Sequence, residues 1–276
     1  MLLELKEISI NYFPDQNILE RIDLNIEKGE FVGIVGKAGC GKTTLLESIG
    51  GLKKPQSGYI YFNGEDIYQN NFNKLNFRKN LQIVFQFPEN QFFEQDVFSE
   101  TSYGLRMHNL PSYVIESRVK QSLESVGFDF GSIRSKSPFS LSGGQKRRLA
   151  LACALAIEPK ILLLDEPFSG LDAEGSKLVA DILINEHQKG TTIVLVSHDP
   201  NILCEICDRI IVLSDRKIAL DGNPVQVYSK NKDLQKIGIV QPYTQILTQL
   251  LGMEQLNDLK YEYFIQRLIK FIQEQA

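Results

Sequence analysis

The sequence predicts an α/β fold built around a parallel sheet, and two patterns lead to that prediction. Short, nearly continuous apolar runs at 31–35, 161–164 and 192–196 are typical of strands that are buried on both faces. Stretches with helical apolar spacing follow these runs. This alternation of strand and helix favours parallel strands that are connected by helices.

Composition narrows the class of protein. The chain has 276 residues, of which 43% are hydrophobic and 23% charged, as in an ordinary soluble globular protein. Its net charge of −4 gives no basic excess, so we expect no nucleic-acid partner. No apolar stretch approaches the roughly 20 residues that span a bilayer, and the N-terminus lacks the pattern of a signal peptide. The four cysteines fit a reducing compartment, so we expect a cytoplasmic protein that reaches a membrane only through a partner.

The first part of the chain alternates in the manner of strands, with turns expected at Pro14-Asp15 and Lys28-Gly29. The last of these strands leads into a glycine-rich turn and a helix that begins near Lys42. Residues 55–63 then predict a turn and a short strand, and the Asn-rich piece 69–76 predicts a surface loop.

The middle of the chain is different because helical spacing dominates it. The pattern predicts helices over 112–126 and 142–157. We therefore expect the block from about 98 to 157 to form a helical subdomain inserted into the α/β core.

The pattern of apolar and polar residues changes again after about residue 222. Apolar residues recur at helical spacing in 246–251 and 261–272, with Gln and Lys between them. We expect a core domain at 1–222 and a helical C-terminal extension at 223–276.

A phosphate-binding loop is predicted directly after the first buried strand. The pattern G-x-x-x-x-G-K-[ST] is matched at each of its fixed positions, by Gly36, Gly41, Lys42 and Thr43. Its variable positions hold Lys37, Ala38, Gly39 and Cys40. Glycines let successive backbone N–H groups turn toward one anion, and the start of a helix favours negative charge. Lys42 would reach the β- and γ-phosphates, Thr43 would hold Mg²⁺, and Thr44 would complete the phosphate site. The alternative is a chance glycine turn, which the flanking strand and helix make a poor explanation.

Two carboxylates follow the buried run 161–164. Such a position places Asp165 and Glu166 at a sheet edge, where ligands bind in open α/β folds. Asp165 would support Mg²⁺, and Glu166 could polarise an attacking water. A strand cap followed by a turn is the simpler alternative for this Asp-Glu-Pro sequence.

The sequence Leu141-Ser142-Gly143-Gly144-Gln145 resembles the signature motif of ATP-binding-cassette (ABC) ATPases, in the place between the phosphate loop and Asp165 that the family requires. Ser142 and the two glycine N–H groups at a helix start would form a second anion-binding surface. In the simpler interpretation, Ser142 only caps the helix. The resemblance implies an ABC-type nucleotide-binding domain of the P-loop NTPase class.

Other ABC elements follow in the expected order. Gln86 resembles the glutamine of the Q-loop, the segment 169–172 ending in Asp172 resembles the D-loop, and His198 resembles the switch histidine. Tyr12 stands where the family places an aromatic residue that stacks on adenine, although neighbouring Phe13 could stack instead. The resemblance covers about residues 2–222 and implies ATP and Mg²⁺ as ligands.

A narrower resemblance begins at Gln86. The sequence Gln86-Phe87-Pro88-Glu89-Asn90-Gln91-Phe92-Phe93 is similar to that of the energy-coupling factor (ECF) ATPases, which belong to importers of vitamins and transition-metal ions. The C-terminal extension also suits that group, whose members use it in pairing ATPase subunits. Phe87, Phe92 and Phe93 could be core aromatics, but we expect exposed anchors for a partner helix.

The resemblance implies a mechanism in which two ATPase subunits, identical or different, face head to tail. ATP lies between the phosphate loop of one subunit and the signature of the other. Glu166 would position or deprotonate water, His198 would contact the γ-phosphate, and Gln86 would link Mg²⁺ and water to integral membrane transport subunits. This implies a peripheral protein at the cytoplasmic face of the membrane. The alternative is a soluble ABC ATPase that acts as an assembly scaffold of the iron–sulfur type, without a membrane subunit.

The cysteines carry two minor expectations. Cys204 and Cys207 could suggest a metal or redox site, but no second pair completes a zinc set, so we expect plain packing. Cys40 lies inside the phosphate loop, where the helix start and Lys42 should lower the cost of a thiolate.

Overall fold

The computed structural model describes residues 1–13, 16–108, 110–229, 231–250, 260, 264–266, 268–270 and 273. The chain forms two compact units. Unit 1 comprises Met1–Ile26, Glu30–Gly64 and Leu195–Ala276, and unit 2 comprises Glu27–Gly29 and Glu65–Val194. The turn predicted at Pro14-Asp15 and most of the helix predicted at 261–272 lie outside the described residues.

Unit 1 contains an antiparallel sheet with the strand order β2-β1-β4. Its strands are β1 (Leu3–Phe13), β2 (Gln16–Ile26) and β4 (Ser57–Phe62). The register of β1 shifts between Leu5 and Ile8, where Glu7 adopts a φ of 48° and its N–H donates to Asp23 Oδ1 at 2.9 Å. This irregularity keeps apolar side chains on the buried face on both sides of the shift.

The same unit contains three further strands in the order β10-β9-β3. These are β3 (Phe31–Gly36), β9 (Arg209–Ser214) and β10 (Lys217–Gly222), with β3 and β9 parallel and β9 and β10 joined as a hairpin. The first five residues of β3 are buried, which confirms the predicted strand at 31–35. The hairpin turns at Asp215 and Arg216, both at positive φ, as a two-residue turn between twisted strands requires.

The helices of unit 1 are α1 (Lys42–Ile49), α8 (Pro200–Ile206), α9 (Pro224–Tyr228), α10 (Asn231–Lys236) and α11 (Tyr243–Leu250). Helix α8 packs closely on β3, because a Cβ built on Gly33 would lie 2.9 Å from Leu203 Cδ2 and 3.0 Å from Cys207 Sγ. Cys204 and Cys207 are buried in this contact, and burial raises the pKa of both thiols. The prediction that they serve packing is confirmed.

The C-terminal segment 223–250 packs against the rest of unit 1. The side chains of Tyr228 and Leu234 have no exposed surface, and Gln241 Nε2 donates to the carbonyl of Tyr228 at 3.3 Å. Helix α11 confirms helical structure at the predicted segment 246–251 up to its last residue, which lies outside the described part of the chain.

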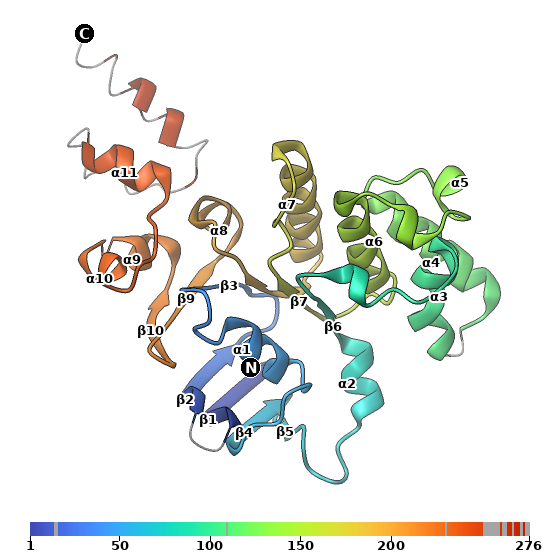
Figure 1. Ribbon diagram of the computed structural model, residues 1–276, viewed down its shortest axis with the longest axis horizontal. Coiled ribbons are helices and arrows are strands. Elements are labelled where there is room, and N and C mark those ends of the chain that lie inside the picture. The colour runs from blue at the N-terminus through green and yellow to red at the C-terminus, as the bar shows by residue number, and fades with distance from the viewer. Residues whose placement is uncertain are drawn as a thin grey trace. The chain divides into compact units, whose positions relative to one another are not determined.

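Unit 2 combines a pair of parallel strands with several helices (Figure 1). Its strands and helices are β5 (Glu65–Asp66), α2 (Lys74–Asn80), β6 (Leu81–Val84), α3 (Val97–Met107), α4 (Ser112–Ser125), α5 (Phe130–Ile133), α6 (Gly143–Leu155), β7 (Ile161–Asp165) and α7 (Ala173–Gln188). Short 3₁₀ turns lie at Pro88–Asn90 and Pro138–Ser140. Strand β8 (Thr192–Val196) lies where the chain passes from unit 2 to unit 1.

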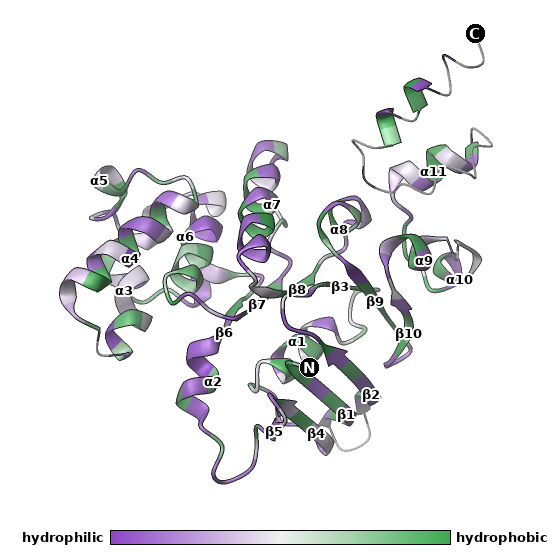
Figure 2. Cartoon of the chain, turned by 180° about the vertical axis from the view of Figure 1, so that it is seen from behind, coloured by the Kyte–Doolittle hydropathy of each residue, from purple (hydrophilic) through white to green (hydrophobic). Residues whose placement is uncertain are grey.

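The predicted strands at 161–164 and 192–196 are confirmed as β7 and β8, in which every residue is buried. The predicted helices at 112–126 and 142–157 are confirmed as α4 and α6. Along α7, polar and apolar residues alternate in the manner of a helix with one buried face (Figure 2).

One local prediction is only partly right. The Asn-rich piece begins as the expected surface loop at 69–73, but Phe72 is buried within it and α2 begins at Lys74. The ring of Phe72 packs edge-on against Phe77 at 5.6 Å, and Asn73 caps the helix by accepting the N–H of Asn76. One asparagine of this piece, Asn73, therefore marks the start of a helix.

Among the described residues, no helix combines the length and the apolar character of a membrane span.

Candidate functional site

The phosphate loop of unit 1 joins the end of β3 to the start of α1. Gly39 and Gly41 adopt φ angles of 77° and 103°, which L side chains rarely adopt. A Cβ on Gly41 would also lie 2.8 Å from Leu19 Cδ2, whereas a Cβ on Gly39 would meet no atom within 4 Å. Gly41 is thus required by backbone conformation and by the close approach of β2.

Lys42 holds this loop in its curve. Its Nζ donates to the carbonyl oxygens of Gly36 at 2.8 Å and Lys37 at 3.0 Å. Thr43 is exposed, but Thr44 is buried and its Oγ1 lies 3.2 Å from the hydroxyl of Tyr12. Of the two predicted threonines, Thr43 therefore presents its side chain at the surface.

Tyr12 lies on β1 with half of its surface exposed. The ammonium of Lys53 lies 4.0 Å from the centroid of its ring, so a cation already covers part of the aromatic surface. Lys53 was not predicted from the sequence. The side chain of Phe13, the alternative stacking residue, lies outside the described part.

The expectation of a stabilised thiolate at Cys40 is wrong. Cys40 is half-buried, and burial raises the pKa of its thiol against the opposing influence of the Lys42 charge. A Cβ on Gly36 would meet the Cys40 sulfur at 2.5 Å, so the thiol packs against the base of the loop. Loss of water outweighs the nearby ammonium.

A hollow of about 430 Å³ lies beside the phosphate loop and is lined by Asn17, Lys37, Gly39, Cys40, Arg216 and Lys236, among others. Arg216 and Lys236 add positive charge next to predicted site residues, and sequence analysis missed both. The backbone of Gly238 also lies directly against the side chain of Lys37. The C-terminal segment therefore contacts the phosphate loop.

The turn after β8 carries His198, whose side chain is exposed. Side-chain hydrogen bonds fix this turn: the Asp199 N–H donates to Ser197 Oγ at 3.2 Å, and the Asn201 N–H and Nδ2 donate to Asp199 Oδ1 at 2.9 and 3.0 Å. The backbone N–H of Tyr243 donates to Asn201 Oδ1 at 2.8 Å. The start of α11 is thus linked to the turn that holds His198.

In unit 2, the predicted signature residues form the start of α6. Ser142 and Gln145 make reciprocal bonds, with the Gln145 N–H donating to Ser142 Oγ at 3.3 Å and the Ser142 N–H donating to Gln145 Oε1 at 3.0 Å. This capping box confirms that Ser142 caps the helix. Gly143 is exposed, and a Cβ on it would meet no atom within 4 Å.

The structure brings the signature and Asp172 together. A hollow of about 390 Å³ is lined by Ser142, Gly144, Gln145, Gly170, Leu171 and Asp172, among others. Asp172 also caps α7, because its Oδ1 accepts the N–H of Gly175 at 2.7 Å. The open side of this hollow leaves room for a ligand or a partner against the start of α6.

The two carboxylates after β7 are buried, with exposed fractions of 3% for Asp165 and 9% for Glu166. Glu166 adopts a φ of 50°, the left-handed region that costs a residue with a Cβ about 1 kcal/mol or more. Its carbonyl accepts the N–H of Ser169 at 3.2 Å. A strained backbone at a buried carboxylate is typical of a functional position.

Arg147, which sequence analysis did not select, joins three predicted elements. It lies on α6 just after the signature, and its Nη1 donates to the carbonyl of Glu166 at 2.7 Å. Its Nη2 donates to the carbonyl of Gln86 at 2.9 Å. Burial lowers the pKa of its guanidinium, and the carboxylates of Glu89 and Glu166 oppose that shift, so the group stays charged.

The aromatic residues after Gln86 differ in exposure. Phe87 and Phe93 are 56% and 60% exposed, as expected of anchors, but Phe92 is 8% exposed. The expectation that Phe92 is an anchor is therefore wrong. It belongs to the core of unit 2.

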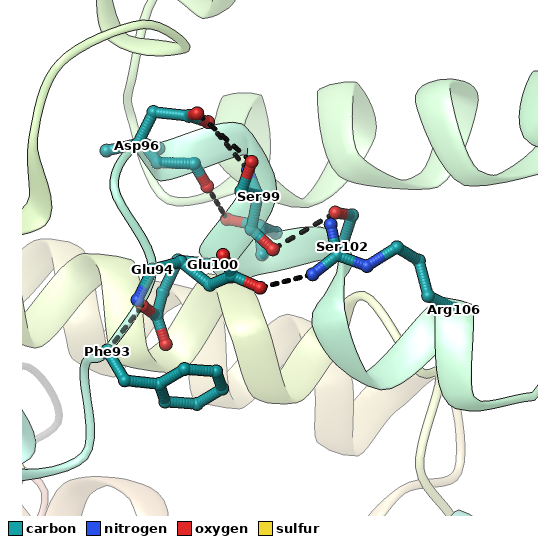
Figure 3. A network of polar contacts seen from close by, with 9 residues as sticks. Phe93, Glu94, Asp96, Ser99, Glu100, Ser102 and Arg106 are labelled. Carbon is teal, nitrogen blue, oxygen red and sulfur yellow. Dashed lines mark hydrogen bonds and ion pairs between the residues drawn. The ribbon is translucent and has the colours of Figure 1, made fainter.

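A buried carboxylate positions the exposed ring of Phe93. Figure 3 shows Glu100, whose Oε2 accepts the backbone N–H groups of Phe93 at 3.0 Å and Glu94 at 2.8 Å. Glu94 in turn pairs with Arg106, and Asp96 caps α3. The bonds hold the loop before α3 in one conformation.

Phe93 then packs edge-on against Tyr103, with ring centroids 4.7 Å apart. Tyr103 and Met107 are 41% and 63% exposed. We name Phe93, Tyr103 and Met107 the aromatic patch. Exposed aromatic and Met side chains are enriched where proteins bind one another.

A phosphate loop, a second helix start that carries Ser-Gly-Gly-Gln, and a buried Asp-Glu pair after a strand define the ATPase subunit of an ATP-binding cassette. The family model "ABC transporter" matches residues 19–169. The chain belongs to this family, and within it to the energy-coupling factor transporter ATP-binding proteins. It is thus an ATPase of the ECF type.

Two relatives illustrate the similarity. The energy-coupling factor transporter ATP-binding protein EcfA2 of Clostridium perfringens is 38% identical over 262 residues, covering 93% of this chain and 92% of that protein. The protein of the same name from Caldanaerobacter subterraneus subsp. tengcongensis is 42% identical over 234 residues, covering 84% and 82%.

Solved structures agree in fold. CbiO1 of Clostridium perfringens, described as part of the ABC transporter complex cbiONQ, matches with a TM-score of 0.76 and 34% identity over 90% of this chain and 98% of that one. The cassette MJ0796, solved as a dimer bound to ADP and Pi, matches with a TM-score of 0.73 and 28% identity over 81% and 99%. The predicted α/β ABC-type fold is confirmed.

Proposed function

We propose that this chain binds Mg-ATP at the loop from Gly36 to Thr44 and hydrolyses it to power an importer of vitamins or transition-metal ions. The observation that carries the proposal is the phosphate loop itself. Gly39 and Gly41 have the positive φ angles that let N–H groups converge, and α1 begins directly after them. Lys42 supports the curve of this loop by donating to the carbonyls of Gly36 and Lys37.

Thr43 and Asp165 are the proposed magnesium ligands. Thr43 of unit 1 would offer a hydroxyl and Asp165 of unit 2 a carboxylate, and both are the hard oxygen donors that Mg²⁺ prefers. When bound, Mg²⁺ would offset negative charge on the phosphates. Lys42 would exchange its bonds to loop carbonyls for the β- and γ-phosphates, and Tyr12 would stack on the base.

The signature residues Ser142, Gly143, Gly144 and Gln145 would bind the nucleotide of a second ATPase subunit, identical or different, in a head-to-tail dimer. Asp172 lines the same hollow and would face that subunit. The negative charge of the γ-phosphate would be stabilised both by the phosphate loop of one subunit and by the signature of the other. ATP would therefore favour the closed dimer more than ADP does. Hydrolysis then reopens it.

Hydrolysis would depend on three side chains. Glu166 would orient the attacking water and accept its proton, and His198 would donate a hydrogen bond to the γ-phosphate. Gln86 would contact Mg²⁺ and water, and it would link both of them to the membrane partner. The buried position of Glu166 strengthens its interaction with water in the closed site.

The aromatic patch and the exposed ring of Phe87 would anchor an apolar helix of the membrane subunit, since Phe87 directly follows Gln86 in the chain. Phe93→Ala with Phe87→Ala should release the membrane subunit from the complex and leave ATP affinity within about twofold, because both rings belong to unit 2 and the phosphate loop belongs to unit 1. Phe92→Ala is the contrasting variant, since its buried ring should matter for stability instead.

The remaining features concern organisation. We propose that 1–222 forms the ATPase domain, that the segment from about 98 to 157 acts as its helical subdomain, and that 223–276 assists pairing with the second subunit. Together with an integral membrane partner, this places the chain at the cytoplasmic face of the membrane as a peripheral protein.

Glu166→Gln tests the proposal. The amide keeps the shape of the carboxylate and loses its basicity, so the full-length protein should bind ATP with wild-type affinity and lose at least about 99% of its turnover. It should also accumulate as an ATP-bound dimer in size-exclusion chromatography. Wild-type turnover by this variant would refute the role of Glu166.

The alternative, a soluble assembly scaffold, differs in its partner. Purification of the tagged chain in detergent should recover an integral membrane protein in stoichiometric amount. Recovery of a soluble iron–sulfur assembly protein, with no membrane protein, would favour the scaffold.

A further inference from the structure

The strained backbone of Glu166 raises the question of what holds it. Residues with a Cβ reach a φ near 50° only when the surroundings impose it. The buried strand β7 fixes the chain up to Asp165, and the turn after it supplies one bond, from the Ser169 N–H to the Glu166 carbonyl at 3.2 Å. The shorter bond to that carbonyl, at 2.7 Å, comes from Arg147.

Arg147 makes this bond with only one arm of its guanidinium. The other arm donates to the carbonyl of Gln86 at 2.9 Å. The guanidinium is planar and rigid, so the distance between these two carbonyls is set by a fixed fork. A shift of the backbone at Gln86 must therefore move the guanidinium or break a bond to Glu166.

Charge and burial strengthen the arrangement. The guanidinium is half-buried, and the carboxylates of Glu89 and Glu166 stabilise its positive charge. Hydrogen bonds from a charged donor are about twice as strong as neutral ones. Removing the donor would take away the shorter of the two bonds to the carbonyl of Glu166, a buried residue, and leave the longer bond from the Ser169 N–H.

We propose that Arg147 is a positioning residue for ATP hydrolysis, which ties the backbone of Glu166 to that of Gln86 and to the signature helix α6. The inference rests on the proposed role of Glu166 as the base. Arg147 touches neither ATP nor water in this role. It sets the direction in which the Glu166 carboxylate leaves the strand, and it makes that direction depend on the segment that faces the membrane partner.

Three variants test this assignment in the full-length protein. Arg147→Met keeps the length of the side chain and removes both donors, so kcat for ATP hydrolysis should fall by about tenfold or more while KM for ATP stays within about twofold. Arg147→Lys keeps the charge, but one ammonium does not reproduce the planar fork, so it should recover less than about a third of the lost kcat.

The matched control is Arg209 on β9, which lines neither proposed nucleotide surface. Its Nη1 donates to the carbonyl of Asn25 at 2.9 Å and its Nε donates to Asp221 Oδ1 at 2.6 Å, so it too joins two segments, but neither contains Glu166 or Gln86. Arg209→Met should lower the thermal midpoint and leave kcat within about twofold. Equal kcat values for Arg147→Met and Arg209→Met would overturn the assignment, and so would full rescue by Arg147→Lys.

Glu166→Gln in the same assay separates this inference from the function beneath it. If Glu166→Gln keeps its turnover, the proposed base is wrong. If Glu166→Gln is inactive while Arg147→Met turns over normally, only the positioning role fails. If both are impaired, the double variant should hydrolyse no more slowly than Glu166→Gln alone, because both changes act on one carboxylate.

Discussion

Two strand ends of this protein carry unusual backbone, and they achieve it by opposite means. After β3, the chain uses glycines: Gly39 and Gly41 take positive φ angles without a Cβ penalty. After β7, Glu166 takes a positive φ although it has a side chain, and a guanidinium from α6 bonds to its carbonyl. The first loop is specified locally, whereas the second depends on a residue 19 positions away.

The difference follows from what each end must present. In the proposed function, the first loop binds phosphate through backbone N–H groups, so glycine can be used there without losing a functional side chain. The proposed base at Glu166 needs its carboxylate, so glycine is excluded there and the strain must be balanced by a contact from elsewhere. A third strand end, after β8, uses neither device and relies on side-chain bonds from Ser197, Asp199 and Asn201.

Gly41→Ala should produce the largest effect. The new Cβ meets Leu19 at 2.8 Å at a φ of 103°, so the free energy of unfolding should fall by about 2–3 kcal/mol. ATP affinity should fall by about 100-fold as the loop opens. Urea unfolding and equilibrium ATP binding measure the two effects. Gly39→Ala is the matched control, because its Cβ meets nothing, and it should lose about 1 kcal/mol; equal losses would contradict the packing argument.

Cys40 tests the geometry of the same loop through its chemistry. Burial raises the pKa of this thiol, and burial raises that of Cys153 to about 12, so maleimide should label Cys40 faster than Cys153 by about tenfold or more. The labelling rate should still be rising at pH 9, because the thiolate fraction grows while the pH remains below the raised pKa. Mass-spectrometric mapping with and without Mg-ATP provides the measurement.

Bound Mg-ATP should protect Cys40, and Cys40→Ser should bind ATP without incorporating label at this position. Labelling that is equally fast with ATP present would show that the phosphates do not lie against the loop.

Glu166→Gly should have the opposite sign to Gly41→Ala. Glycine removes the strain of the left-handed backbone, so this variant should be about 1 kcal/mol more stable than Glu166→Ala, which keeps the Cβ. Both variants lack the carboxylate, so the difference isolates the backbone. Urea unfolding of Glu166→Gly and Glu166→Ala measures this difference in the free energy of unfolding, provided that the two curves have the same slope. Equal midpoints for the two variants would show that the backbone of Glu166 carries no strain.

The smallest expected effect concerns the third strand end. Tyr243→Pro removes the N–H that donates to Asn201, and proline is tolerated there because Tyr243 is the first residue of α11. The free energy of unfolding should fall by about 1 kcal/mol relative to Tyr243→Ala, which keeps the N–H and loses only an exposed ring. An equal thermal midpoint for the two variants would mean that the C-terminal segment does not support the turn at His198.

Local patterns predicted much of this molecule. The buried runs became β3, β7 and β8, and the phosphate loop formed where strand, glycines and helix coincide, because each of these depends on neighbouring residues. The signature helix start was also foreseen, since a capping box is a four-residue signal.

What the sequence could not predict depends on distant contacts. Phe92 and Phe93 are neighbours of identical chemistry, yet the fold buries one and exposes the other. The Cys40 thiol was expected to be stabilised by Lys42, but the desolvation that outweighs this charge comes from the surrounding packing. Arg147 stands in a run of basic residues in which nothing local distinguishes it from Lys146 or Arg148.

The close packing of α3 on the chain after α6 depends on one missing side chain. A Cβ on Gly104 would meet the Ile157 side chain at 2.5 Å, so the backbone of α3 lies directly against that side chain. Any larger residue at position 104 would have to displace Ile157 or push the two segments apart. Gly104 thereby sets the spacing between α3 and the chain after α6.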